Sequence, residues 1–115
     1  MNDEKDSVEK ALVHASTADI LSVLSNPIRL EILASIAKAE KCVSEIADAL
    51  ELDASSVSHS LGLLSDKDLV KHTPLKKQRI YRLSDAVIAS VDGTKVCFDV
   101  TTMSGEKLSF ETHLP

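Results

Sequence analysis

The sequence predicts an α+β fold in which a mostly helical core is followed by β-hairpins. Apolar residues recur at helical spacing as far as Leu64 and at every second position in several segments from Val70 onward. The length of 115 residues suits one compact domain, expected to span 1–115, and 43% hydrophobic residues suffice for a core. That core must be largely aliphatic, because the chain has two Phe, one Tyr and no Trp.

The first part of the chain is expected to hold helices separated by a restart at Asn26. Residues 1–10 are polar and should fray, and a helical pattern follows with a break or polar turn at 16–17. Asn26 can cap a new helix and Pro27 suits its first position. This helix should end near Ala39.

Two shorter helices are expected next. The first covers about 43–50 and begins at Cys42 or Ser44. Asp53 is the expected N-cap of the second, which covers about 54–65. A four-residue turn joins them.

Alternation of period two then predicts strands at 70–73 and 78–83, joined by a loop at 74–77. In the C-terminal third, Ser84 could cap a helix, but the Asp92-Gly93 hairpin signal favours a strand before it. The expected C-terminal β extension, including an added hairpin, covers about 87–114 with strands at 87–91, 94–102 and 107–114.

This order of elements is that of a winged helix-turn-helix, with the helix-turn-helix at about 43–65 and a two-stranded wing at about 68–83. Small polar residues on the second helix would let it enter a DNA major groove closely. Its expected exposed residues are Ala54, Ser55, Ser56, Ser58, His59 and Ser60. The candidate DNA-binding residues are Ser55, Ser56, Ser58 and His59 on the helix, and Lys76, Lys77 and Arg79 on the wing.

Charge distribution supports this interpretation although the net charge is −5. Residues 66–82 hold six Lys or Arg against two Asp, which gives +4 and leaves −9 on the rest of the chain. A basic face on an acidic body suits a specific DNA binder with weak non-specific affinity. The acidic body also keeps open an alternative, a winged-helix module that binds protein.

Residues 19–83 resemble the ArsR/SmtB family of bacterial and archaeal repressors. The matching stretches are 24–33, 42–50, 55–61 and 79–83. The resemblance implies a homodimer that binds a palindromic double-stranded DNA operator and is released by an inducer, which the sequence does not identify. It places Ser55, Ser58 and His59 at DNA-contacting positions and Lys77 on the wing.

Several features depart from the family pattern. Ala54 stands where Gln is frequent, and Lys76 stands where the wing often has Gly. Strands replace the usual last helix, which pairs with the first helix in family dimers. The added strands could therefore either join the dimer surface or cover the core of their own subunit.

The sequence offers no complete sensor site. Cys42 matches the first position of a family Cys-x-Cys metal motif, but Ser44 occupies the second. The histidines His14, His72 and His113 show no ligand spacing, so no metal and no cofactor is expected. A second alternative is a redox or reactive-sulfur sensor that uses Cys42 and Cys97 as a dithiol switch, since a helix N-terminus activates a thiol.

Other classes are disfavoured. The chain lacks a Gly-rich phosphate loop, a nucleophile elbow and paired catalytic carboxylates, so an enzyme is not expected. The acidic start 1–6 does not resemble a signal peptide, and no apolar run approaches the ~20 residues that span a bilayer. The expected location is the cytoplasm, without a membrane partner.

Overall fold

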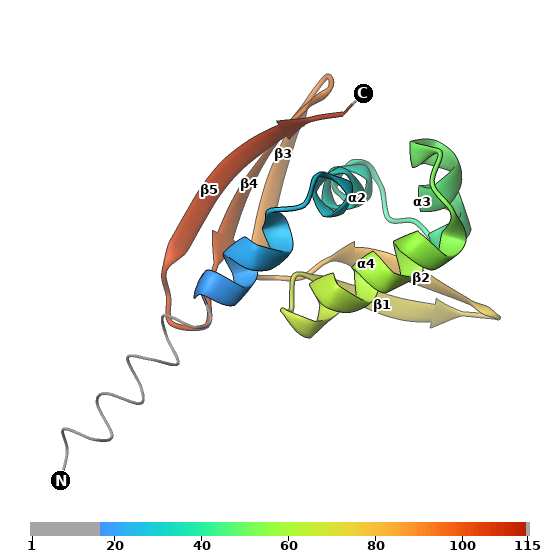
Figure 1. Cartoon of the computed structure of the whole chain (residues 1–115), viewed down its shortest axis with the longest axis horizontal. Helices are drawn as coiled ribbons and strands as arrows, with labels where there is room; N and C mark the ends of the chain where they lie inside the picture. The colour runs from blue at the N-terminus through green and yellow to red at the C-terminus, as the bar shows by residue number, and fades with distance from the viewer. Residues whose placement is uncertain (1–16, 115) are drawn as a thin grey trace, which may run out of the picture.

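A computed structural model describes residues 17–114 and shows a winged helix-turn-helix with an additional sheet (Figure 1). The predictions for residues 1–10, Ser16 and His14 lie outside the described part. The helices are Thr17–Leu24, α2 (Pro27–Lys38), α3 (Val43–Leu50) and α4 (Ala54–Asp66). The strands are β1 (Val70–Leu75), β2 (Gln78–Leu83), β3 (Val87–Asp92), β4 (Lys95–Thr101) and β5 (Lys107–His113).

Both ends of α2 are closed by side chains. The amide oxygen of Asn26 accepts hydrogen bonds from the backbone N–H groups of Ile28 (2.9 Å) and Arg29 (3.3 Å), which confirms the predicted cap. At the other end, the ammonium group of Lys41 donates to carbonyl oxygens at the helix C-terminus, including that of Ala39 (3.0 Å). Partial burial lowers the pKa of Lys41.

The strands form two antiparallel sheets, β1–β2 and β3–β4–β5. The alternative helix after Ser84 is wrong. The Ser84 hydroxyl accepts from the N–H of Ala86 (3.2 Å) and its carbonyl accepts from the N–H of Val87 (3.1 Å), so the chain turns directly into β3. The favoured strand is therefore confirmed, and the C-terminal hairpin β4–β5 gains β3 as a third strand.

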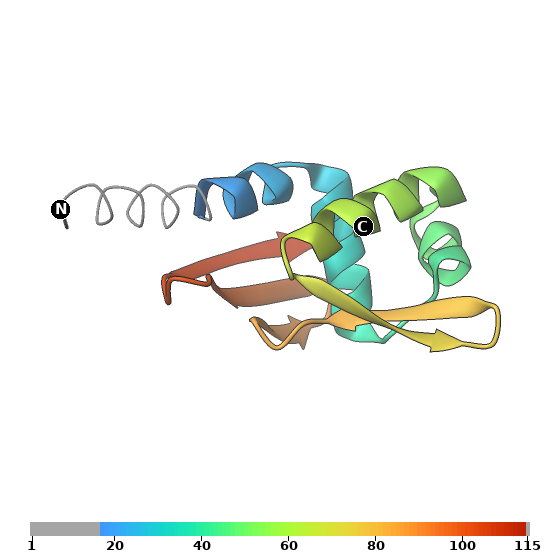
Figure 2. The same ribbon diagram turned by 90° about the horizontal axis from the view of Figure 1, so that it is seen from below.

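One hydrophobic cluster connects all these elements. Ile32 and Leu33 of α2, Ile46 of α3 and Leu61 of α4 have no solvent exposure, and Phe98 of β4 is 1% exposed. Figures 1 and 2 show the three-stranded sheet at one end, the helix-turn-helix and wing at the other, and α2 between them. The C-terminal sheet thus covers the core of its own subunit, which was one of the two predicted roles.

Within residues 17–114, no single helix is both long and apolar enough to cross a membrane. Thr17–Leu24 and α2 meet that criterion only as a pair, and the pair is bent by 91°. The buried apolar residues of α2, from Ile32 to Ile36, also form part of the core.

Candidate nucleic-acid interface

Asp53 fixes the start of α4, as predicted. Its carboxylate accepts hydrogen bonds from the Ser56 backbone N–H (2.7 Å), the Ser56 hydroxyl (2.8 Å) and the Ser55 hydroxyl (3.2 Å). The backbone N–H of Ser56 is the main reason why the pKa of Asp53 lies below its ordinary value. The first-turn serines are therefore held in place by the cap before any ligand arrives.

The lowered pKa of Asp53 gives a testable pH dependence. Stabilisation by this carboxylate is present above the ordinary Asp pKa of about 4 and is lost as the pH falls through the lowered folded-state value. Asp53→Asn caps a helix without titrating. We expect the advantage of wild type over Asp53→Asn in urea unfolding to shrink between pH 7 and about pH 3. An unchanged difference would contradict the role of the charge.

The exposed side of α4 forms a stripe, which we call the α4 stripe and define as Ser55, Ser58, His59 and Gly62. These positions are spaced by three or four residues and so share one helix face. An added Cβ at Gly62 would meet no atom within 4 Å, so this end of the stripe is open. Gly62 was not predicted as part of the interface, although the helical spacing from Ser55 points to it.

Ser60 and Ser56 lie differently from the prediction. Ser60 was expected to be exposed, but it is buried. It lies three residues after Val57 and four before Leu64, so it belongs to the apolar face of α4. Ser56 is half-buried, and its hydroxyl is used in the cap.

The wing carries cations that are free of ion pairs. Lys76, Lys77 and Arg79 are exposed, and so is Lys71 on the other strand. Among residues 17–114, the ion pairs Lys67–Asp19 and Lys95–Glu111 involve none of them. Their charges remain available to phosphate groups.

Arg82 was not singled out from the sequence as a site residue. It lies opposite Lys71 in the wing register, and its guanidinium donates to the Thr73 hydroxyl (3.0 Å). The basic surface therefore continues from the tip toward the base of the wing. The antiparallel pairing of the two wing strands, which places Arg82 opposite Lys71, could have identified Arg82 as part of this surface.

The tip of the wing is tighter than the predicted four-residue loop. Leu75 pairs with Gln78, so the strand continues through Pro74 and the turn contains only Lys76 and Lys77. Lys76 has φ 57°, the left-handed conformation that Gly adopts without penalty. Lys76 thus keeps a backbone shape suited to Gly while adding a charge.

The base of the wing is joined to the helix-turn-helix. The N–H of Tyr81 donates to the carbonyl of Lys41 (2.8 Å), and the N–H of Lys41 donates back to the carbonyl of Tyr81 (3.3 Å). The rings of His72 and Tyr81 pack 5.4 Å apart. The segment before α3 is therefore tied to β2, which supports the wing next to the helices.

The two cysteines are free and are not brought together. Cys42 is 4% exposed at the N-cap of α3, with its sulfur 3.2 Å from the Ser44 hydroxyl. Cys97 lies on β4, on the sheet face opposite to Phe98. Figures 1 and 2 show α3 and β4 at separate ends of the molecule. Among residues 17–114, no group of three His, Cys, Asp or Glu residues could hold a metal ion.

The geometry defines the class of protein: a winged helix-turn-helix with a polar helix stripe and a basic wing. Residues 26–72 match the family model described as bacterial regulatory protein, arsR family. The chain belongs to this ArsR family, as the sequence indicated.

Curated relatives support the assignment. The chain is 35% identical over 68 residues to the transcriptional repressor SmtB homolog of Synechocystis sp., covering 59% of this chain and 52% of the relative. It is 30% identical over 74 residues to the biofilm growth-associated repressor of Xylella fastidiosa, covering 64% and 65%. The chain thus spans about half to two thirds of the length of these relatives.

Solved structures agree in fold. A winged helix-turn-helix DNA-binding domain from Mycobacterium bovis, described as homodimeric, superimposes with a TM-score of 0.62 at 30% identity and covers 64% of this chain and 68% of that one. NolR from Sinorhizobium fredii gives a TM-score of 0.62 at 32% identity and covers 67% and 77%.

Proposed function

We propose that this chain is a homodimeric repressor that binds operator DNA with the α4 stripe in the major groove and the wing along the phosphate backbone. The observation that carries the proposal is the exposed α4 stripe beside a hairpin whose cations have no ion-pair partner among residues 17–114. Membership of the ArsR family and the repressor names of its relatives support it. Such a protein would act in the cytoplasm, where its DNA lies, and its inducer is unidentified.

The side chains divide into two roles. His59 and Ser58 project from the exposed face of α4, where a ring nitrogen and a hydroxyl can bond base edges. Ala54 offers a methyl group that can contact thymine. Lys76 and Lys77 at the tip supply phosphate contacts, which add affinity without reading sequence.

Lys77→Ala tests the wing assignment. We expect affinity for the DNA upstream of the chain's own gene to fall about 3- to 10-fold, and the salt dependence of log Kd to lose about one unit of slope. Fluorescence anisotropy at several salt concentrations measures both quantities. Lys38→Ala, which removes an exposed lysine at the end of α2, is the matched control and should leave the slope unchanged.

The same titration separates the proposal from a protein-binding winged helix. A repressor must bind its operator more tightly than unrelated DNA of equal length, and the preference must decrease in His59→Ala, because one good base contact is worth about 1–3 kcal/mol. Equal affinity for both DNAs in wild type, or no binding to either, would refute the proposed function.

A further inference from the structure

The C-terminal sheet leaves one edge of β5 open. Within residues 17–114, β5 pairs only with β4. The N–H of Leu114 donates to the carbonyl of Thr94 (2.8 Å), so even-numbered residues of this strand bond toward β4. The backbone groups of Lys107, Ser109 and Glu111 therefore point to the open edge. Such an edge is a template for pairing with another strand.

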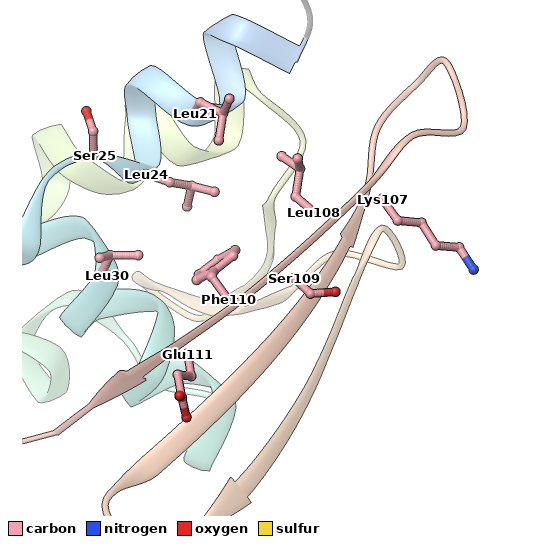
Figure 3. Close-up of a pocket in the computed structure, with 9 residues that line it drawn as sticks. All are labelled: Leu21, Leu24, Ser25, Leu30, Lys107, Leu108, Ser109, Phe110 and Glu111. Carbon is pink, nitrogen blue, oxygen red and sulfur yellow. The ribbon is translucent and has the colours of Figure 1, made fainter.

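An apolar groove runs along this edge. Its apolar lining consists of Leu21, Leu24, Leu30, Leu108 and Phe110. In Figure 3, Leu108 and Phe110 point toward the leucines of the two helices, whereas Lys107 and Ser109 point away from them. Leu21, at the rim, is 50% exposed. The half-exposed Leu21 and the groove thus lie on the same surface patch. A two-fold symmetric contact requires such a self-complementary patch.

We propose that a second copy of this chain occupies the groove, with β5 pairing antiparallel to the partner's β5 about a two-fold axis at Ser109. In this register Lys107 lies opposite the partner's Glu111, and Leu108 lies opposite the partner's Phe110. Each pair occurs twice by symmetry. Opposite charges therefore meet on one face and apolar side chains meet on the other, the cross-strand combinations that stabilise a sheet.

The neighbouring register is less complementary. A two-fold axis at Phe110 would place Lys107 opposite the partner's His113 and Ser109 opposite the partner's Glu111. Neither pair joins a carboxylate to a lysine. On the other side, an axis at Leu108 would place Lys107 opposite the partner's Ser109 and Glu111 opposite the partner's Gly105. Of the three registers, only the axis at Ser109 joins Lys107 to Glu111.

The same symmetry explains the half-exposed leucine. Because the axis is perpendicular to the sheet, the inward faces of both sheets lie on one side, and so do both Thr17–Leu24 helices. Leu21 lines the groove of its own copy and is half-exposed, so the second copy seated on the groove would remove part of its remaining apolar surface from water. This inference rests on the proposed function, in which the chain is a homodimer, and it identifies the β5 edge and the groove as the surface through which the two copies contact each other.

Cross-linking tests the axis directly. In the full chain with Cys42→Ser and Cys97→Ser, Ser109→Cys should form a covalent dimer under oxidised glutathione, because hydrogen-bonded antiparallel partners have Cα atoms about 5.5 Å apart, within disulfide range. Lys107→Cys alone should not cross-link, whereas Lys107→Cys with Glu111→Cys should. Ser90→Cys, exposed on β3, is the control for random collision. The proposal is overturned if Ser109→Cys stays monomeric on a non-reducing gel or matches Ser90→Cys.

Charge exchange provides a second measurement in solution. Glu111→Lys should raise the dimer Kd about tenfold in sedimentation equilibrium, because two attractive pairs across the axis become repulsive. It also removes the ion pair of Glu111 with Lys95 of its own chain (3.2 Å), so Lys95→Ala, which should leave the dimer Kd nearly unchanged, is the control. Lys107→Glu combined with Glu111→Lys should recover most of that loss, and failure to recover it would count against the register. A wild-type dimer without Ser109→Cys cross-linking would refute this surface but not the proposed function. Wild-type binding to upstream DNA decides the proposed function separately.

Discussion

Ser58→Glu is expected to weaken operator binding by at least about 100-fold. Ser58 is exposed in the middle of the α4 stripe and has a small side chain. A glutamate there would bring a carboxylate to the polyanion surface, where like charges facing each other across an interface cost several kcal/mol. Electrophoretic mobility shift or anisotropy at moderate salt measures the loss.

Two controls separate this charge effect from other causes. Ser58→Ala removes only a hydroxyl and should cost less than about tenfold, since one neutral hydrogen bond contributes about 0.5–1.5 kcal/mol. Ser90→Glu adds the same charge at an exposed position on β3 and should leave DNA binding unchanged. Thermal unfolding of Ser58→Glu should match wild type. If Ser58→Glu and Ser90→Glu bind DNA equally well, α4 is not the DNA-facing helix.

Local signals predicted the caps and helices well because they depend on few neighbouring atoms. Asn26 and Asp53 accept the backbone hydrogen bonds that their positions suggested. The prediction that Ser60 is exposed is wrong, because it depends on the polarity of serine, whereas the position of Ser60 relative to Val57 and Leu64 puts it on the buried face of α4. Inside a helix, the position of a small polar residue in the helical repeat indicates its burial better than its residue type does.

Features that depend on distant segments could not be obtained in this way. The bond between the Tyr81 and Lys41 backbones joins residues that no local pattern relates, and the separation of Cys42 from Cys97 follows from the packing of whole elements. The open edge of β5 can be identified only from the strand order of the sheet, which the local sequence pattern does not give. The sequence therefore predicted helix starts and strand positions better than it predicted which distant surfaces pack against each other.

Phe98→Ala should be the most destabilising of the substitutions considered. Phe98 is 1% exposed on the central strand β4, lies between Ala89 and Phe110 in the sheet register, and stacks on the Phe110 ring at 5.1 Å. Truncating a buried phenylalanine costs about 3–5 kcal/mol, a large share of the 5–15 kcal/mol typical of a domain. The melting temperature should fall by at least about 10 °C in calorimetry. Ile88→Ala, at a side chain 69% exposed on β3, is the control and should change stability by less than about 0.5 kcal/mol.

The number of thermal unfolding transitions of Phe98→Ala tests whether the C-terminal sheet and the helix-turn-helix unfold together. Because α2 packs against β2 of the wing and also against β3 and β5, the C-terminal sheet and the helix-turn-helix share one core. We therefore expect Phe98→Ala to unfold in a single transition, detected at the same temperature by circular dichroism and by loss of DNA binding. A low-temperature step that removes β signal while DNA binding persists would show instead that the sheet is a separable appendage. In that event residues 1–115 would not fold as one cooperative unit.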